Sequence, residues 1–290
     1  MTEPQHPHPE VNSLLNITDP AERVKQATTL IETYQALIND DIGPIRREAL
    51  KELISSGLNQ TEVGEKVGMT RARIGQILSS GPRPERAFLG TGNVLTIAVG
   101  GKEESGRTDG SASAMMSRGA SDAYGILAEL ARSLGLKPQP VEIVAPPGHV
   151  DLNRPGLIVL CGPRLLPFVG QVLGADPKYG FVEDATGNYL IDRETGTEYR
   201  SPADSGVSTD YAYVGRLPRP DGKGTFLYLA GIHAAGTKGA ARYVEANLES
   251  LWKDHKTRRF SGLVECRYDA KMNIIEATPL TKFHRHEGVN

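Results

Sequence analysis

The sequence contains few cysteines. Cys161 and Cys266 are the only two among 290 residues, and they lie in different predicted strands. Neither belongs to a spacing that is typical of metal ligands. We therefore expect reduced thiols, a cytoplasmic chain and no metal site.

Long apolar runs and an excess of positive charge are also missing. No run of ~18 apolar residues is present, so we expect no membrane span. The first residues, MTEPQHPHPEVN, lack the basic start and apolar core of a secretion signal; we expect residues 1–17 to form a disordered tail. The formal net charge of -2 argues against a polyanion-binding surface over the whole molecule, although charge can still be segregated by domain.

What is present suffices for two domains. The chain is 39% hydrophobic and 23% charged, as in ordinary globular proteins. The predicted fold class is α/β. We expect an N-terminal all-α helix-turn-helix domain over residues 18–82 and a linker over 83–93. A Rossmann-like α/β domain with an antiparallel β insertion follows over 94–290.

Residues 19–38 predict an amphipathic helix. Asp19 and Pro20 suit the N-cap and the first turn. Apolar residues then recur at alternating spacings of three and four, which places them on one helix face. They are Val24, Ala27, Ile31, Tyr34 and Ile38. This face can pack on the next helices of the same chain or form a short coiled coil with a second copy.

A more specific pattern lies at residues 58–78, LNQTEVGEKVGMTRARIGQIL. Asn59 and Thr70 are each suited to cap a short helix, and Gly68 permits the tight turn between the two helices. A helix, a glycine-containing turn and a second helix form the layout of a helix-turn-helix. The stretch resembles the helix-turn-helix of sigma-factor region 4 and of related bacterial regulators.

The start of the second helix supplies the candidate DNA-reading residues. In a helix-turn-helix these positions meet base edges in the major groove, where Arg reads guanine, Gln reads adenine, and Thr or Ala touches a thymine methyl. The outward residues are Thr70, Arg71, Ala72, Arg73 and Gln76. Phosphate contacts are expected from the flanking Arg46, Arg47, Arg83 and Arg86. The alternative is a plain helical hairpin whose arginines are only solvated.

Two strand ends in the C-terminal part carry the candidate ligand site. One apolar run ends in Cys-Gly-Pro-Arg at 161–164, and another ends in Gly-Ile-His-Ala-Ala-Gly-Thr at 231–237. Ligands of α/β sheets bind at such strand ends, and the N-terminus of the following helix favours an anion. The candidate ligand-binding residues are Gly162, Arg164, His233, Gly236, Thr237 and Lys238. The alternative is a Thr237 that only caps its helix and a His233 that is hydrogen-bonded in the core.

Four segments of this part, LIVLCGPR, DPKYGF, YLIDRETGTEY and LAGIHAAGTKGAA, resemble a Rossmann-like domain of actinobacterial helix-turn-helix proteins. Relatives with GGP and GIHxxGT motifs occur in other prokaryotes. The resemblance covers about residues 94–283. It implies ligand sensing rather than a particular reaction.

The leading hypothesis is a transcription regulator that binds double-stranded DNA and a small anion such as a nucleotide. We expect a homodimer, with most of the buried area on the C-terminal domain. The second hypothesis is a nucleotide hydrolase or glycosidase fused to a DNA-targeting module, with His233, Asp210 and Asp176 as candidate general bases. A third makes the helical domain a protein-interaction module. The sequence identifies no cofactor.

Overall fold

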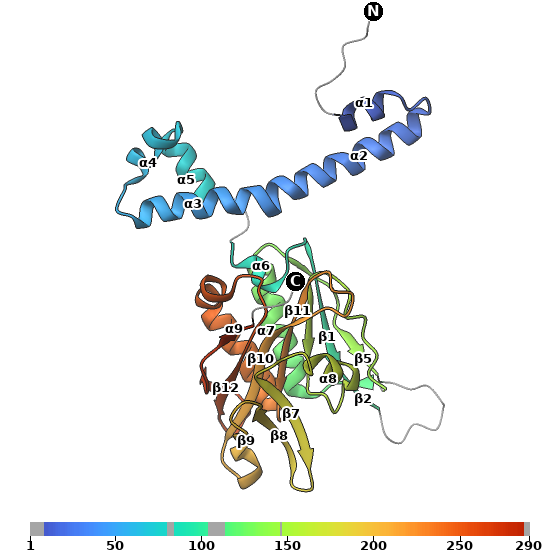
Figure 1. Cartoon of the computed structure of the whole chain (residues 1–290), viewed down its shortest axis with the longest axis vertical. Coiled ribbons are helices and arrows are strands. Elements are labelled where there is room, and N and C mark those ends of the chain that lie inside the picture. Colours follow the sequence, from blue (N-terminus) through green and yellow to red (C-terminus); the bar gives the residue numbers. More distant parts are fainter. Residues whose placement is uncertain (1–8, 80–83, 104–113, 146, 287–290) are drawn as a thin grey trace, which may run out of the picture. The chain divides into compact units, whose positions relative to one another are not determined.

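The computed structural model describes residues 9–79, 84–103, 114–145 and 147–286 (Figure 1). The chain divides into two compact units, Met1–Arg83 and Pro84–Asn290. We call them the N-terminal unit and the C-terminal unit and describe each by itself. No helix among the described residues is long and apolar enough to cross a membrane.

The N-terminal unit is helical. Its elements are α1 (Pro9–Leu15), α2 (Pro20–Ala36), the π-helix η1 (Leu37–Ile42), α3 (Gly43–Ser55), α4 (Gln60–Val67) and α5 (Arg71–Ser79). Asp19 caps α2, since its carboxylate accepts from the Ala21 amide at 3.0 Å. The expected disordered tail differs from the structure at α1, where the Tyr34 hydroxyl donates to the Glu10 carboxylate at 3.3 Å. Residues 1–8 lie outside the described part.

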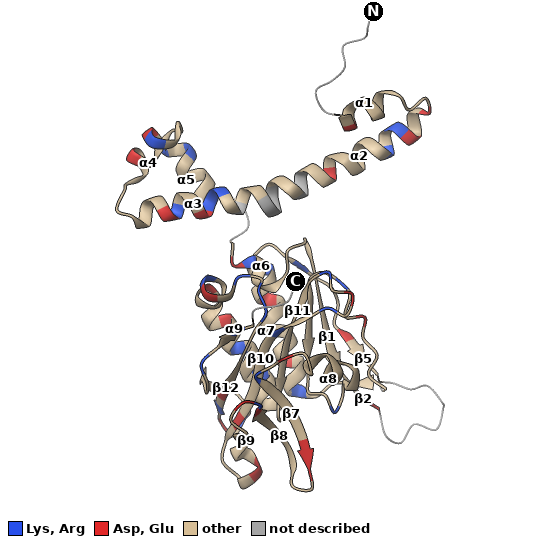
Figure 2. Ribbon diagram, viewed as in Figure 1, with Lys and Arg blue, Asp and Glu red and all other residues tan. Residues whose placement is uncertain are grey.

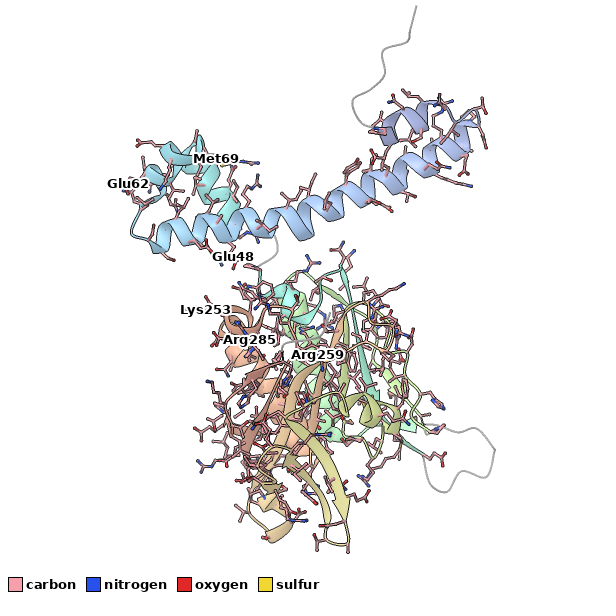
Figure 3. The ribbon with its side chains drawn as sticks, in the orientation of Figure 1. Glu48, Glu62, Met69, Lys253, Arg259 and Arg285 are labelled. Atoms are coloured by element: carbon pink, nitrogen blue, oxygen red, sulfur yellow. The ribbon has the colours of Figure 1, made fainter. Side chains whose placement is uncertain are left out.

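The last three helices pack around a small core of their own, made of Leu50, Val63, Ile74 and Ile77. Asn59 and Glu62 form a reciprocal capping box at the start of α4, and Figure 3 labels Glu62 in the first turn of this helix and Met69 in the turn that follows it. Gly68 ends α4 in the left-handed conformation, with φ 70°. These caps fix the angle between α4 and α5 without help from a larger core.

The C-terminal unit alternates strands and helices. Its elements are α6 (Arg86–Leu89), β1 (Val94–Gly100), β2 (Lys102–Glu103), β3 (Ala114–Met115), α7 (Arg118–Ser133), β4 (Lys137–Pro138), β5 (Glu142–Val144), β6 (Leu157–Leu160), α8 (Pro167–Leu173), β7 (Tyr179–Asp184), β8 (Gly187–Asp192), β9 (Glu198–Arg200), the 3-10 helix η2 (Pro202–Ser205), β10 (Thr209–Pro218), β11 (Thr225–Gly231), α9 (Ala234–His255), β12 (Phe260–Tyr268), β13 (Ile274–Pro279) and β14 (His284–Arg285).

A mixed nine-stranded sheet organises this unit, in the order β13-β12-β10-β11-β6-β1-β4, with β14 on β12 and β5 on β1. The ladders from β11 through β6 and β1 to β4 and β5 are parallel, and those from β11 to β13 and β14 are antiparallel. The α/β class is therefore confirmed. The expected antiparallel insertion is the separate sheet β7-β8-β9.

Two apolar layers cover the main sheet. The side chains of α7 and α9 form one core with alternate residues of β1, β6 and β11, such as Ile97, Ile158 and Leu229. The intervening residues of these strands point to the other face and pack with α8 and the insertion. Strands buried on both faces explain the continuous apolar runs in the sequence.

The expected linker at 83–93 is wrong for most of its length. Residues 86–89 form α6, and Phe88 and Leu89 are buried in the core with the sheet and α9. The Arg86 guanidinium is also buried, and it donates to the Gly92 carbonyl at 2.6 Å and the Asn93 side chain at 2.7 Å. Arg86 is thus a structural residue of the C-terminal unit and not a phosphate contact. Residues 80–83 lie outside the described part.

The strand order creates a switch point at the carboxyl edge of the parallel strands. From β1 the chain passes through α7 to β4 and β5 on one side of β1, and it then returns to β6 on the other side. The next parallel strand, β11, lies beside β6. Such reversals open a crevice at the carboxyl ends of the strands.

Candidate functional site

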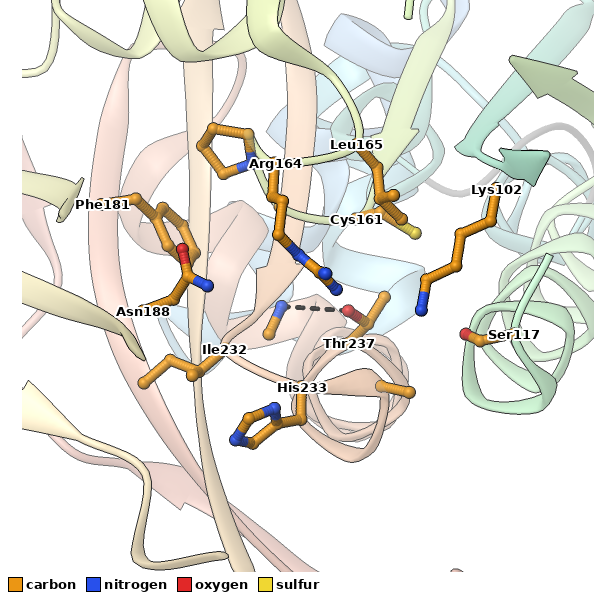
Figure 4. Close-up of a pocket in the computed structure, with 14 residues that line it drawn as sticks. Lys102, Ser117, Cys161, Arg164, Leu165, Phe181, Asn188, Ile232, His233 and Thr237 are labelled. Carbon is orange, nitrogen blue, oxygen red and sulfur yellow. Dashed lines mark hydrogen bonds between the residues drawn. The ribbon is translucent and has the colours of Figure 1, made fainter. Parts of the chain in front are cut away.

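The two strand ends meet in a cavity of about 240 Å³, which we call the carboxyl-edge pocket (Figure 4). Four of the candidate ligand residues line it: Gly162, Arg164, His233 and Thr237. Because β6 and β11 are parallel neighbours, the turns that follow them share one edge of the sheet. The sequence missed other lining residues, of which Lys102, Ser117, Phe181 and Asn188 matter most.

At the end of β6 the backbone turns sharply. Cys161 is left-handed, with φ 88°, a conformation that is rare for a residue with a side chain. The Tyr228 hydroxyl donates to its carbonyl at 2.9 Å and helps to hold the turn. Burial raises the pKa of the Cys161 thiol to about 11, so the thiol is neutral near pH 7. The turn carries Gly162 and Arg164 over the pocket.

At the end of β11, Asp210 holds the start of α9. Its Oδ2 accepts from the amides of His233 at 3.0 Å and Gly236 at 2.7 Å. The Thr237 hydroxyl accepts from the Gly231 amide at 3.0 Å, drawn as the dashed line in Figure 4. Thr237 is therefore not the helix cap, and two of the amides expected for a ligand already bind a carboxylate. The amides of Ala234 and Ala235 donate to no described residue.

Asp210 is fully buried, and burial raises the pKa of this carboxyl. Hydrogen bonds to the ionised form oppose that rise. They come from the Ser201 hydroxyl at 2.7 Å and the Tyr211 amide at 2.9 Å, besides the two amides of α9. Asp210 thus lies behind the pocket, bonded on both oxygens, and is unsuited to act as a general base there.

Gly236 and Lys238 do not belong to the pocket. A Cβ at Gly236 would lie 2.6 Å from the Asp210 carboxylate and 2.7 Å from the Tyr211 carbonyl, so this glycine allows the chain to pack on itself and not on a ligand. Lys238 is paired elsewhere: its Nζ lies 2.7 Å from the Asp122 carboxylate and donates to the Met272 carbonyl at 2.9 Å. The expected ligand contacts of Gly236 and Lys238 are wrong for the same reason: each residue packs against or pairs with protein residues that are distant in the sequence.

Two cations face the pocket without a counterion. The side chains of Lys102, in β2 just beyond β1, and Arg164, beyond β6, are exposed and make no hydrogen bond or ion pair with any described residue. Figure 4 shows both side chains extending toward Thr237 from different sides. No carboxylate of the described residues lines the pocket. A signal for Lys102 exists in the sequence, since it follows a Gly-Gly pair at the end of an apolar strand.

A second helix also begins at the pocket. Ser117 caps α7, and its hydroxyl accepts from the Ala120 amide at 3.2 Å. A Cβ at Gly119 would lie 2.4 Å from the carbonyl oxygen of Ala234, so the first turns of α7 and α9 touch backbone to backbone. Both are long helices, of 16 and 22 residues. The positive dipole end of α7 therefore adds to the charges of the two cations, whereas the Asp210 carboxylate already offsets that of α9.

The insertion supplies the remaining wall. Phe181 on β7 and Asn188 on β8 line the pocket and flank it on the side away from Lys102 (Figure 4). The register pairs Phe181 with Leu190 and Glu183 with Asn188, so Phe181 and Asn188 lie on the same face of the hairpin. The pocket thus has a cationic side and a side with an aromatic ring and an amide.

His233 lines the rim of the pocket. Its Nε2 lies 2.8 Å from Oδ1 of Asp204 in η2, and both side chains are nearly half exposed. The structure therefore contradicts a His233 hydrogen-bonded in the core. Because Nε2 of His233 contacts the Asp204 carboxylate, only Nδ1 of this imidazole can bind a ligand.

Asp176, the remaining candidate general base, does not line the carboxyl-edge pocket. Asp176 is fully buried and accepts from the Tyr213 hydroxyl at 2.7 Å. Ser261, His286 and Asp176 lie together, but both contacts of the imidazole use the same nitrogen, Nε2, which rules out a relay through the ring. No group of three or more metal-ligating side chains occurs among the residues that the structure describes.

The N-terminal unit presents the expected outward face on α5. Its five residues, Thr70, Arg71, Ala72, Arg73 and Gln76, are exposed, while Ile74 and Ile77 face the core. Thr70 caps α5 through the Arg73 amide at 3.2 Å. Figure 2 shows basic and acidic residues intermixed along α3 to α5, so the arginines do not extend into a broad basic surface.

The flanking arginines differ among themselves. Arg46 is exposed. Arg47 is buried, and its Nε donates to the Ile77 carbonyl at 3.1 Å, which ties α3 to α5. Arg47 is therefore a structural residue and not a phosphate contact. Arg83 lies outside the described residues.

Comparisons of the chain with protein-family models, with curated proteins and with solved structures gave no match.

Proposed function

We propose that this protein is a DNA-binding transcription regulator whose C-terminal unit senses a phosphorylated nucleotide in the carboxyl-edge pocket. The observation that carries the proposal is the pair Lys102 and Arg164, two cations without counterions at a sheet switch point where two helices begin. A half-enclosed pocket with this charge and no lining carboxylate has unfavourable self-repulsion that an anion relieves.

Phosphate suits the cationic side better than a lone carboxylate does. A guanidinium binds two phosphate oxygens through its planar fork, and an ammonium acts as a point charge beside it. The Ser117 and Thr237 hydroxyls and the Ala234 amide supply neutral donors at the same place. Two cations match the charge of a phosphate monoester.

The opposite wall argues for a base attached to that phosphate. An aromatic ring such as that of Phe181 is a stacking surface for any base. The Asn188 side chain has both a donor and an acceptor, as needed to bind the polar edge of a base. These two residues line the same cavity as Lys102 and Arg164, so one nucleotide can reach both sides.

DNA binding is proposed for α5. Two arginines and a glutamine stand exposed on the first two turns of a helix that a capped partner helix orients. These residue types read guanine and adenine in the major groove. A protein-interaction role is less favoured because the face is cationic instead of neutral.

A symmetric dimer completes the proposal, and we place the contact between copies on α2. Val24 and Ile31 on α2 and Ile38 in the adjoining η1 recur every seven residues and remain 67%, 56% and 55% exposed. β-Branched residues at heptad spacing favour a two-stranded coiled coil. A dimer presents two copies of α5 to two half-sites, which is the usual arrangement for this class.

The ligand is tested by calorimetry with nucleoside 5′-monophosphates, the matching nucleosides and inorganic phosphate. We expect at least one monophosphate to bind and its nucleoside to bind at least about tenfold more weakly, a difference of about 1.4 kcal/mol. Lys102→Gln and Arg164→Gln should each weaken the monophosphate by a similar factor. Arg242→Gln, at an exposed arginine paired with Glu245 on α9, is the matched control and should bind as wild type does.

A second comparison separates the two walls of the pocket. Phe181→Leu should weaken the monophosphate and leave the affinity for inorganic phosphate unchanged. Failure of every monophosphate to bind the folded wild-type protein contradicts the sensing role. Equal binding to wild type, Lys102→Gln and Arg164→Gln contradicts the assigned site.

A further inference from the structure

A second cavity of about 240 Å³ lies at the opposite edge of the parallel strands. It is lined by residues where these strands begin, including Gly156 before β6 and Thr225 at the start of β11, and by α6. We call it the amino-edge pocket. Three basic residues line it, Arg216, Arg219 and Lys223.

Arg216 is the unusual residue of this pocket. It is 5% exposed, yet it makes no ion pair with any described residue. Burial alone lowers the pKa of its guanidinium to about 10, so the group remains charged at neutral pH. Taking an isolated charge out of water is unfavourable unless an opposite charge compensates for it.

The partners of Arg216 are all neutral. Its guanidinium donates to the Phe88 carbonyl and, at 3.4 Å, to the Thr225 hydroxyl. Its central carbon lies 5.3 Å from the centre of the Phe88 ring. Its Nε has no hydrogen-bond partner among the residues that the structure describes. These contacts position the guanidinium without neutralising it.

The other two cations leave the pocket with excess charge. Arg219 pairs with Asp221, and the exposed Lys223 makes no ion pair with any described residue. Three cations and one carboxylate leave about two positive charges around the cavity. Because Arg216 is already buried, a dianion that enters the pocket gains attraction without a new desolvation cost on that side chain.

We propose that the amino-edge pocket binds a phosphate dianion, as a second site independent of the carboxyl-edge pocket. The ligand neutralises Arg216 and contacts Arg219 and Lys223 at the mouth. Because Arg216 also binds the Phe88 carbonyl at the end of α6, occupancy steadies the helix through which the chain enters the C-terminal unit.

The test uses inorganic phosphate and the full-length double variant Lys102→Gln/Arg164→Gln, whose carboxyl-edge pocket lacks its cations. Both substituted residues are exposed and have no partner among the described residues, so folding is not at risk. At constant ionic strength, phosphate should bind this protein with one equivalent by calorimetry. Adding Lys223→Gln and Arg219→Gln should weaken binding at least tenfold. Adding Arg267→Gln, at an exposed arginine on β12, should leave it unchanged.

Thermal unfolding and amide hydrogen exchange give two further tests. Phosphate should raise the Tm of the double variant, and adding Arg216→Met should abolish the rise whether or not it alters the starting Tm. Amide hydrogen exchange at residues 86–90 should slow on phosphate addition. The proposal is overturned if phosphate does not bind the double variant, or if it binds equally after Lys223→Gln and Arg219→Gln. Neither result bears on nucleotide binding at the other edge.

Discussion

At the residue scale, Asp210 binds the amides at the start of α9, a capping role that one interpretation of the sequence gave to Thr237. Four hydrogen bonds converge on one fully buried carboxylate, two of them from the first turn of α9. A carboxylate at a helix N-terminus satisfies amides that would otherwise be unpaired and interacts favourably with the helix dipole. The start of α9, and with it one side of the carboxyl-edge pocket, depends on this side chain.

We therefore expect Asp210→Asn to lower the free energy of unfolding by about 1–3 kcal/mol, because an amide nitrogen would face backbone donors in a buried site. Urea denaturation followed by circular dichroism measures the change. Asp204→Asn is the matched control: its carboxylate is about half exposed and contacts His233, so its effect should stay within about 0.5 kcal/mol. Equal effects of the two substitutions would contradict the capping role.

The arginines of α5 give a second prediction at this scale. If Arg71 or Arg73 makes a bidentate contact to guanine, its replacement by alanine weakens binding to a duplex selected from a random library by about 1–3 kcal/mol. Arg46→Ala should instead weaken all sequences alike and reduce the salt dependence, as expected of a phosphate contact. Fluorescence anisotropy measures both. An unchanged sequence preference in Arg71→Ala/Arg73→Ala would remove α5 from the reading role.

At the element scale, α2 is a helix with an uncovered apolar face. Within the described residues, Val24 and Ile31 on α2, and Ile38 in the adjoining η1, have no core to join, whereas α3, α4 and α5 bury their own apolar residues together. A single surface helix of this kind is marginal in water and gains stability by packing. The proposed contact with a second copy supplies that packing.

We expect wild type to sediment as a dimer at micromolar concentration and Ile31→Asp/Ile38→Asp to sediment as a monomer. Two carboxylates opposite two others in a coiled-coil seam repel and lose their hydration. Thr29→Asp, exposed on the same helix but outside the stripe, should remain dimeric. A double variant that stays dimeric would move the interface to the C-terminal unit.

Features that depend on neighbouring residues could be predicted from the sequence, and features that depend on distant residues could not. The parallel neighbours β6 and β11 were predictable because each is a continuous apolar run followed by a glycine turn and a helix. Lys102 was harder to place, because its position in the pocket depends on β1 lying beside β6. The contacts of Asp210 with the start of α9 and of Lys238 with Asp122 were not predictable from spacing, since these partners lie 23 to 116 positions away along the chain. The helix α6 was not predicted for another reason. Its four residues lie between prolines and glycines and are too few to show a helical periodicity.

At the scale of the whole molecule, the boundary between the units lies at Arg83 and Pro84 instead of at the end of the expected linker. Phe88 and Leu89 belong to the core of the C-terminal unit. A fragment of residues 84–290 should therefore be more stable than one of residues 94–290. Loss of the two buried side chains lowers the free energy of unfolding by about 3–6 kcal/mol.

Urea denaturation of the two fragments checks this, with the full chain as reference. The longer fragment should unfold in one cooperative transition, and the shorter one at a lower urea concentration. Identical midpoints would mean that α6 is an appendage of the C-terminal unit and that the linker does extend to residue 93.

The inserted sheet β7-β8-β9 has a consequence for how such a pocket can change over evolutionary time. The cationic floor comes from the main sheet and the starts of α7 and α9, where backbone contacts such as that between Gly119 and Ala234 leave little freedom. The wall with Phe181 and Asn188 comes from a hairpin that hydrogen-bonds within its own sheet. If the proposed nucleotide binds here, substitutions on that one face can exchange the base or even the class of molecule that is bound, while the proposed phosphate site and the fold persist. The inserted sheet can therefore change in sequence independently of the main sheet, and we expect sequence variation among descendants of this protein to concentrate in it.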